Sequence, residues 1–324
     1  MFGSFTQSDK YFNTVQKFTG TVKNFVIGVG IATIVVGVCY IIISPMIGVL
    51  SRAFMSYEDV ANPLVFLIPH NFTLDNMRFA LQYLQYWSTV GRTLIFSGGF
   101  ALFNVLITSM VGYGFARFRF RGSNVLFALV IVSIVVPPQT YMVPLFINFR
   151  FFLGHPDWNW VVPATIGGYA MPFSWSLLLL TFGGVGLRSG LYIYIFRQFF
   201  RGLPKEIEEA ALIDGAGPFY TYAKIMIPNA VPALLTVFLF AFVWHYNDVF
   251  YSSLLVSGNR FMPIMITSLG NTFRLIELND GQDPLLVQLV VFAGVILAIL
   301  PVLTIYVFLQ RQFVEGLERS GIVG

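Results

Sequence analysis

The residues that could carry metal or nucleophilic chemistry are few in this 324-residue sequence. It has three histidines, His70, His155 and His245, and one cysteine, Cys39, which lies in an apolar run. No H-E-x-x-H motif occurs, and a single cysteine gives neither a disulfide framework nor a cysteine-based metal site. The G-x-x-x-x-G-K-[ST] loop that cradles ATP phosphates is absent from the sequence as well. We therefore expect that the chain is not an enzyme and has neither a catalytic nor a metal-binding site.

Polar side chains are also rare inside the apolar stretches. Asn247 and Asp248 follow Trp244 near the end of one such stretch. A carboxylate at membrane depth costs about 2.5–3.5 kcal/mol on insertion scales, so it normally faces the interior of a helix bundle or an aqueous cavity. Asp248 could therefore line a path or take part in proton coupling, and it could equally hydrogen-bond a neighbouring helix. The sequence leaves both interpretations open.

A polar segment holds the third group of candidate residues. Pro204 suits the first turn of a helix, and the acidic side chains that follow it favour a helix N-terminus. Asp214 and Gly215 supply a turn, because glycine adopts positive φ without strain. Residues 219–227 form a second amphipathic stretch, which Pro228 ends. The segment predicts a helix-turn-helix whose small-residue face could fit a cleft on a partner, and an ordinary interfacial loop is the alternative.

Composition indicates what kind of structure must position these residues. Hydrophobic residues make up 56% of the sequence and charged residues 10%, whereas a soluble domain carries about 25% charged residues. A soluble core of this size could not hide so much apolar surface, so lipid must be the solvent for much of the chain. The composition excludes a soluble enzyme, a nucleic-acid-binding module and a disordered linker protein, and it makes the lipid bilayer a partner.

Membrane-spanning helices are the elements that this composition predicts. Such a helix needs about 20 mostly apolar residues. Region 161–200 is largely apolar but is interrupted at 183–188, and it is long enough for one kinked span or for two. Five clear candidates lie outside that region, at 26–49, 93–115, 125–146, 230–251 and 285–309.

Two groups of glycines fall in the apolar stretches, Gly112-Tyr113-Gly114 and Gly183-Gly184. Small residues let membrane helices approach one another closely. We therefore interpret both groups as helix-packing glycines rather than as ligand-binding loops.

The positive charges indicate the orientation. If region 161–200 crosses once, six spans put both termini on one side of the membrane, together with twelve of the 19 Lys and Arg residues, while the other side holds five. An excess of Lys and Arg marks the cytoplasmic side, so we expect both termini to be cytoplasmic. The predicted segments are a cytoplasmic arm (1–25), a first transmembrane helix (26–50), an outer loop (51–91), a core of five transmembrane helices (92–309) with a cytoplasmic loop (201–228), and a cytoplasmic tail (310–324).

The predicted helix-turn-helix carries a recognisable spacing of residues. Glu209-Ala210-Ala211 is followed after three residues by Gly215 and after nine more by the run Ile-Met-Ile-Pro at 225–228. This pattern resembles the signature of binding-protein-dependent ABC importer permeases, which reads Glu-Ala-Ala, three residues, Gly, nine residues, Ile, any residue, Leu-Pro. An Ile in place of the Leu is the one departure.

In that family the loop is the coupling helix, which docks into a groove on a cytoplasmic ATPase subunit. The resemblance implies that Glu209 and Asp214 face basic groups of the ATPase. It implies that Ala210, Ala211 and Gly215 allow close approach. It also implies an all-α integral membrane protein with six transmembrane helices and the type I ABC importer permease fold, located in a bacterial cytoplasmic membrane.

The likeness continues along the chain from Arg92 onward. Residues 112–146 resemble the second-to-third-span region of carbohydrate importers, and 242–248 resembles their aromatic-plus-Asn segment. Residues 310–324 resemble the tail of the smaller maltose-type permease subunit, which reaches into the ATPase dimer, except that Val323 replaces the usual Lys.

A permease of this family is half a pore. The resemblance implies three kinds of protein partner: a second homologous permease subunit, two ATPase subunits that bind ATP and Mg, and an extracytoplasmic solute-binding protein. It implies no cofactor in this chain. Closure of the ATPases would pull the coupling loops and rotate the permease halves, which would expose the cavity to each side in turn.

The carbohydrate-type regions favour a sugar as the transported substrate, either an oligosaccharide or a polysaccharide such as alginate. Trp244, Asn247 and Asp248 are then candidates for the substrate path, because aromatic faces and amide groups suit sugar rings and hydroxyls; packing of the permease interface is the alternative role. Two other functions stay open. One is the same machinery for an amino acid, a peptide or phosphate, and the other is an ion-coupled secondary transporter that uses Asp248.

Overall fold

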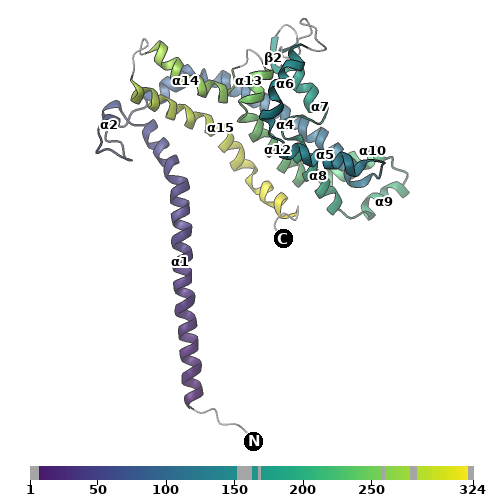
Figure 1. Cartoon of the computed structure of the whole chain (residues 1–324), viewed down its shortest axis with the longest axis horizontal. Helices are drawn as coiled ribbons and strands as arrows, with labels where there is room; N and C mark the ends of the chain where they lie inside the picture. Colours follow the sequence, from purple (N-terminus) through teal and green to yellow (C-terminus); the bar gives the residue numbers. More distant parts are fainter. Residues whose placement is uncertain (1–6, 152–162, 167–168, 257–259, 278–282, 320–324) are drawn as a thin grey trace. The chain divides into compact units, whose positions relative to one another are not determined.

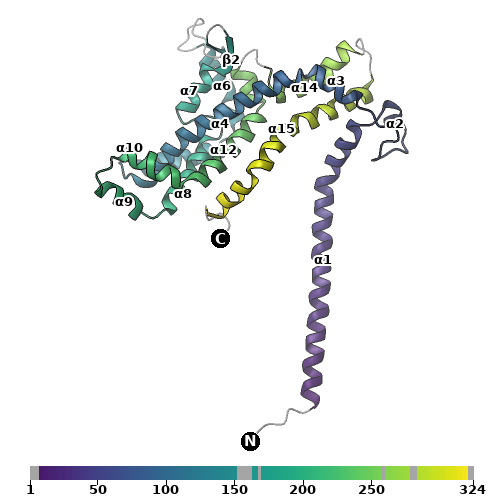
Figure 2. The same ribbon diagram turned by 180° about the vertical axis from the view of Figure 1, so that it is seen from behind.

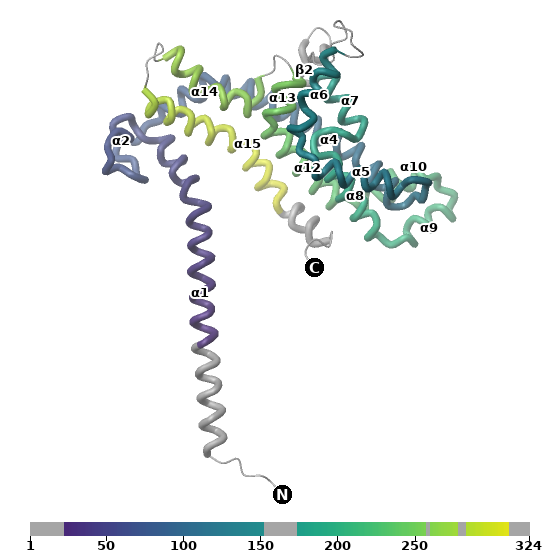
Figure 3. The backbone as a smooth tube through the Cα atoms, in the orientation of Figure 1, coloured from purple at the N-terminus to yellow at the C-terminus, as the bar shows by residue number. Residues whose placement is uncertain are grey.

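The computed structural model divides the chain into two compact units, Met1–Leu74 and Asp75–Gly324, and each is described by itself. Nearly all regular structure in the described residues is helical (Figure 1), and Figure 3 traces the backbone. The described residues are 7–151, 163–166, 169–256, 260–277 and 283–319.

The first unit contains one long helix. α1 (Gln7–Ala53) is continuous for 47 residues, so the described part of the predicted arm and the first predicted span belong to a single helix. Its portion Lys23–Ala53 is apolar enough to cross a membrane, and its apolar window is 0% buried within this chain. Such a surface is suited to contact with lipid.

The predicted outer loop begins with a fold around a buried carboxylate. Ser56 caps the short helix α2 (Tyr57–Ala61) by accepting a hydrogen bond from the Asp59 backbone N–H at 3.2 Å. The Asp59 carboxylate accepts a hydrogen bond from the Asn71 backbone N–H at 2.8 Å and is nearly inaccessible to solvent. It therefore ties two stretches of this loop together.

In the second unit the central element is α4 (Tyr86–Arg117), which contains the predicted span 93–115. It packs along α8 (Ser189–Gly202) and α12 (Val231–Tyr246). Phenylalanines of α4 form a core with residues of α7 (Trp175–Phe182) and α13 (Phe250–Leu255). This helix thus connects most of the elements that hold the candidate residues.

The glycine predictions have different outcomes. A Cβ built on Gly112 would lie 2.5 Å from the Phe196 Cβ of α8, so its predicted packing role is confirmed. A Cβ on Gly114 would meet nothing within 4 Å, and one on Gly183 would meet only atoms of its own turn. Gly184 has φ +70° and lies in the same turn. Gly183 and Gly184 lie in the turn after α7, and for these three glycines the packing role stays a prediction.

The predicted span 125–146 is broken. α5 (Ser123–Val135) and α6 (Pro138–Arg150) meet at an angle of 103°. The cause is the pair Pro137-Pro138, because proline lacks an N–H and holds the preceding residue out of the helical conformation. Val136, just before the pair, is extended, with ψ 119°.

Region 161–200 contains a short β-hairpin within an otherwise helical fold. β1 (Pro163–Ile166) pairs antiparallel with β2 (Tyr169–Ser174). The sequence of this stretch has two prolines and a Gly-Gly pair, which are the residues least favourable in a helix. α7 (Trp175–Phe182) follows the hairpin, and the predicted interruption separates it from α8.

The predicted span 230–251 also ends early, because α12 stops at Tyr246. The segment with Trp244, Asn247 and Asp248 therefore lies across a helix end. The other elements are α3 (Asp75–Tyr83), α9 (Glu206–Ile213), α10 (Pro218–Thr221), the π-helical turn η2 (Tyr222–Met226), α11 (Ile227–Asn229), α13 (Phe250–Leu255), α14 (Met262–Ile276) and α15 (Pro284–Arg319).

The described residues contain three helices that could each cross a membrane alone, Lys23–Ala53, Tyr86–Arg117 and Pro284–Gln310. The pair α5–α6 and the pair formed by 218–229 with α12 add two more if each bent pair counts as one span. The protein is therefore a helical membrane protein with three to five candidate spans.

Tyr83 at the end of α3 donates a hydrogen bond to Glu277, which follows α14. This bond raises the pKa of the Tyr83 phenol to about 12. Because the pKa in the folded chain is above its ordinary value of 10.0, the stabilisation is complete below pH 10.0 and is lost as the pH rises towards about 12. The contact between these two elements is thus intact at neutral pH.

Candidate functional site

The predicted helix-turn-helix is present, and its turn has a defined geometry. α9 begins at Glu206 and ends at Ile213. The Gly215 N–H donates to the Leu212 carbonyl at 3.1 Å and the Ala216 N–H to the Ala211 carbonyl at 3.0 Å. These two bonds, with Gly215 at φ +83°, form a Schellman motif. The positive φ is what favours glycine here. Lack of space is not the reason, because a Cβ would meet nothing within 4 Å.

The five predicted coupling residues do not share one environment. Glu209, Ala210, Asp214 and Gly215 are exposed, whereas Ala211 is buried within the chain. The exposed four can meet a partner directly. Ala211 instead packs α9 onto the chain itself.

Exposed apolar side chains gather on the same hairpin. Ile213 is 85% exposed and Phe219 is 69% exposed. Leu212 and Tyr220 beside them are also exposed. A group of exposed apolar side chains such as this one is a feature of interaction surfaces. We call Leu212, Ile213, Phe219 and Tyr220 the coupling tip.

A buried ion pair ties α9 to the end of α4. The Arg117 Nε lies 3.1 Å from Glu208 Oε2, and the two side chains are 5% and 15% exposed. Tyr113 donates a hydrogen bond to Glu208 Oε1 at 2.6 Å, and Arg117 Nη2 donates to the Leu203 carbonyl at 2.8 Å. The sequence analysis missed this anchor, since its partners are far apart in the chain and no local pattern joins them.

The second arm of the hairpin is attached to α4 as well. The hydroxyls of Ser109 and Tyr222 lie 2.8 Å apart. The rings of Tyr113 and Tyr222 are 5.2 Å apart between centroids, a distance at which aromatic pairs attract. Both arms are thus attached to the end of α4 that bears Arg117, whereas the coupling tip is exposed.

Asp248, a predicted path residue, is buried and hydrogen-bonded. Its carboxylate accepts bonds from the Tyr251 N–H at 3.2 Å, the Ser252 N–H at 2.7 Å and the Ser252 Oγ at 2.8 Å. It therefore satisfies the free N–H groups at the start of α13. This geometry favours a capping role and provides a structural reason for a carboxylate at this depth.

The other two predicted path residues make none of the hydrogen bonds of that cap. Trp244 is 42% exposed, and the Arg188 guanidinium carbon lies 4.3 Å from the centroid of its ring. Asn247 is exposed and donates to the Val243 carbonyl at 3.0 Å. The structure thus brings Trp244 together with an arginine that the sequence analysis did not propose.

A polar network lies in the core beside these residues. Asn104 Nδ2 lies 3.0 Å from His245 Nε2, and Ser189 donates to Asn104 Oδ1 at 3.0 Å. The network joins α4, α12 and the start of α8, and the Phe100 ring packs on His245. Such buried polar contacts fix how helices pack against each other.

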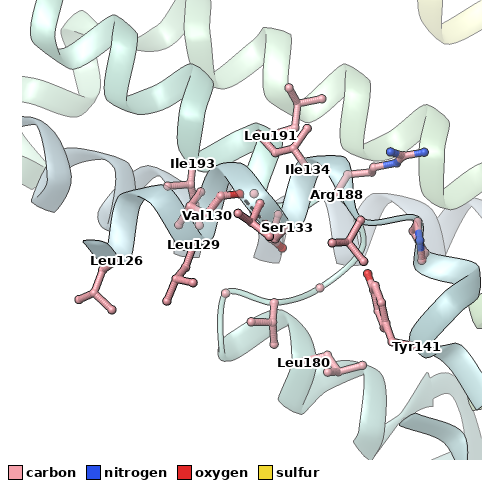
Figure 4. A pocket seen from close by; sticks show the side chains of 18 of the residues that line it. Leu126, Leu129, Val130, Ser133, Ile134, Tyr141, Leu180, Arg188, Leu191 and Ile193 are labelled. Carbon is pink, nitrogen blue, oxygen red and sulfur yellow. Dashed lines mark hydrogen bonds between the residues drawn. The ribbon is translucent and has the colours of Figure 1, made fainter. Parts of the chain in front are cut away.

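A cavity of about 550 Å³ opens between α5, α6 and the α7–α8 turn (Figure 4). Its walls are mostly apolar, with Leu129 and Ile193 among them. Four polar side chains, Ser133, Tyr141, Arg188 and Ser189, also line it. Mostly apolar walls with a few convergent polar groups are typical of small-molecule sites.

Comparison with protein families gives one match over most of this unit. The family described as binding-protein-dependent transport system inner membrane component matches residues 88–319. This range includes the helix-turn-helix, its anchor and the cavity.

Individual relatives are similar over most of their length. The chain is 26% identical over 289 residues to the arabinooligosaccharides transport system permease protein of Halalkalibacterium halodurans. This match covers 88% of this chain and 92% of the relative. It is 26% identical over 294 residues to the polygalacturonan/rhamnogalacturonan transport system permease protein of Bacillus subtilis, covering 88% and 93%.

A solved structure shares the fold. It is the crystal structure of a bacterial ABC transporter involved in the import of the acidic polysaccharide alginate. One of its chains is 20% identical, with a TM-score of 0.62, and the match covers 96% of this chain and 100% of that one.

Proposed function

The chain belongs to the family of binding-protein-dependent transport system inner membrane components, and from this membership we propose how its parts work in a sugar importer. It is a multi-pass permease subunit of an ABC importer in the inner membrane, and ATP is handled by a partner ATPase and not by this chain. The substrate, the coupling contacts and the topology are the proposals that follow.

We call the helix-turn-helix formed by α9, α10 and η2 (206–226) the coupling hairpin. It is the site through which ATPase motion reaches the membrane. The observation that carries this proposal is the combination of an exposed coupling tip and a buried anchor. Glu209 and Asp214 face basic groups of the ATPase, and Ala210 and Gly215 allow it to approach. The Glu208–Arg117 pair, 3.1 Å apart, passes the displacement to α4, because a buried charge pair resists separation.

The transported substrate is a saccharide. The printed names of the relatives support this class, since they refer to arabinooligosaccharides and to polygalacturonan/rhamnogalacturonan. Trp244 and Asn247 are exposed and could contact sugar rings and hydroxyls along the path. Asp248 would act on the path through α13, whose first turn it caps.

The chain forms half of the pore. The other half is a second homologous permease subunit, and two ATPase subunits and an extracytoplasmic solute-binding protein complete the importer. Six crossings, with α7 and α8 together as the fourth, keep both termini and the coupling hairpin cytoplasmic. The excess of Lys and Arg on that side supports this arrangement.

Site-specific crosslinking tests the coupling proposal. In a Cys39→Ser background, Ile213→Cys should crosslink to the ATPase subunit, because Ile213 is 85% exposed on the coupling tip. Val132→Cys, which is 53% exposed on α5, serves as the control and should not react with the ATPase. Absence of any crosslink from Ile213→Cys in an assembled, transporting complex would refute the proposed contact.

The two alternative functions have less support. Import of an amino acid, peptide or phosphate would use the same coupling hairpin, but the names of the relatives favour saccharides. Ion coupling through Asp248 would need a carboxylate free to exchange protons with a path, and this one is engaged in three hydrogen bonds. We therefore propose ATP-driven saccharide import alone.

A further inference from the structure

Arg188 occupies an unusual position in the fold. It lies where the polypeptide turns from α7 into α8, and it precedes the first residue of α8. Its backbone has φ +60°, a left-handed conformation that few residues other than glycine adopt. Strain of this kind persists where the surrounding structure enforces it, and it clusters at functional sites.

The charge of Arg188 lacks a counter-ion among the described residues. Its Nε is buried without a hydrogen-bond partner there, and no ion pair joins Arg188 to an Asp or Glu of the described residues. The Asp248 carboxylate is occupied by the start of α13. An arginine at membrane depth normally has a partner or faces a pathway, so this one is suited to an anionic ligand.

The surroundings of Arg188 suit a sugar ring. Its guanidinium lies over the ring of Trp244 at 4.3 Å, and it lines the cavity shown in Figure 4. Tyr141 lines the same cavity, and its hydroxyl accepts a hydrogen bond from Tyr251 at 3.2 Å. Arg188 thus lies between an exposed aromatic ring, Trp244, and a cavity that also contains the Tyr141 hydroxyl. A free guanidinium fork matches the two oxygens of a carboxylate.

The break between α7 and α8 adds to the positive potential. A helix N-terminus carries a partial positive charge, and α8 begins immediately after Arg188. Membrane transporters place such broken helices at anionic groups of their substrates. The Tyr192 hydroxyl, in the first turn of α8, is buried and has no hydrogen-bond partner in the described residues.

Resting on the proposed import of saccharides, we infer that Arg188 and Trp244 form a subsite for an acidic sugar, one whose ring bears a carboxylate. The guanidinium binds the carboxylate, and the exposed part of the Trp244 ring packs on the sugar. Tyr141 orients a sugar hydroxyl. A neutral sugar would leave the guanidinium without a counter-ion, so the subsite distinguishes uronate-containing saccharides from neutral ones of the same length.

Direct binding to the whole complex tests this inference. The complex of this permease with its partner permease and ATPases is trapped in the outward-facing state with ATP and vanadate, without the binding protein. Equilibrium dialysis then measures the dissociation constants of tetragalacturonate and of maltotetraose. We expect tetragalacturonate to bind more tightly, and Arg188→Gln to weaken it by about tenfold or more, since a charge-assisted contact is lost. Arg188→Lys should keep part of the preference.

A matched variant controls for general effects. Arg150 also stacks on an aromatic ring, Phe151, at 5.4 Å, but it lies outside the lining of the cavity. Arg150→Gln should leave both dissociation constants unchanged. Equal losses for both saccharides in Arg188→Gln, or no loss for either, would overturn the inference. So would dissociation of the partner permease from that variant, because Arg188 would then pair across the subunit interface.

Transport measurements separate this inference from the proposed function. ATP-driven uptake is measured in proteoliposomes with the binding protein. Suppose that maltotetraose is taken up equally by the unaltered protein and by Arg188→Gln, and that tetragalacturonate does not bind. This result would refute the acidic subsite and leave saccharide import intact. Uptake of neither saccharide, with uptake of another class of solute, would refute both.

Discussion

At the scale of single residues, the coupling hairpin separates two roles that its sequence presents as one. Ala210 and Asp214 are exposed, whereas Ala211 faces the chain itself. Glu208, next to the recognised Glu209, is held by Tyr113 and Arg117. Neighbouring glutamates on one helix thus point to different elements, because successive residues are about 100° apart around a helix. We propose that Glu209 contacts the ATPase and that Glu208 transmits the displacement.

Removing the anchor should uncouple the protein. Glu208→Ala breaks a buried ion pair and a hydrogen bond, which costs about 1.5–3 kcal/mol for each bond to a charged group. We expect transport to fall by about tenfold or more, with ATPase subunits still bound and hydrolysis less dependent on substrate. Uptake and ATP hydrolysis in proteoliposomes measure this.

Glu206→Ala is the matched control for that experiment, because Glu206 lies in the same first turn and is exposed. It should behave like the unaltered protein. Normal coupling in Glu208→Ala would show that the ion pair does not transmit the motion. A fall in transport in both variants would indicate that the negative charge at the start of α9 matters, and not the ion pair.

At the scale of elements, helix packing and helix breaks decide the layout. Gly112 lets α4 and α8 approach so closely that a Cβ would overlap Phe196. The Pro137-Pro138 pair turns α5 away from α6 by 103°. Asp248 starts α13 just after α12 ends. Each of these features changes the direction or the spacing of a helix, so it determines which side chains can line a common cavity.

Enlarging Gly112 should destabilise the α4–α8 contact. In Gly112→Ala the new methyl group would lie 2.5 Å from the Phe196 Cβ and 3.1 Å from a backbone nitrogen, and overpacking of this kind costs about 1–3 kcal/mol. We expect a lower Tm of the detergent-solubilised complex. Gly114→Ala, two residues away with open space around it, should leave the Tm unchanged. Equal Tm values for the two variants would contradict the close packing.

At the scale of the whole molecule, the protein is one part of a larger machine. It matches an importer family over residues 88–319 and exposes many apolar side chains, which need lipid or another subunit to cover them. The coupling tip and the cavity belong to the same unit, with the tip on α9 and α10 and the β-hairpin at the opposite end (Figures 1 and 2). Force applied at one end can therefore act on a site between the helices.

Cysteine labelling should reveal the proposed topology. In a Cys39→Ser background, a membrane-impermeant maleimide added to spheroplasts should label Phe66→Cys and Arg260→Cys, which are exposed in predicted outer loops. Arg121→Cys, exposed in a predicted inner loop, should react only after the membrane is permeabilised. Labelling of Arg121→Cys in intact cells would require another number of crossings.

The sequence by itself determined the membrane environment, the family and the coupling hairpin. Each of these depends on composition or on residues close together in the chain, such as Gly215 and the spacing around it. Even the break at Pro137 had a local signal that the span prediction did not use. The tertiary structure alone decided which distant side chains meet. Tyr113 and Glu208 are 95 residues apart, and Arg188 lies in the α7–α8 turn while Trp244 lies in α12. Such contacts depend on how helices cross, and the spacing of residues along one helix does not encode the crossing.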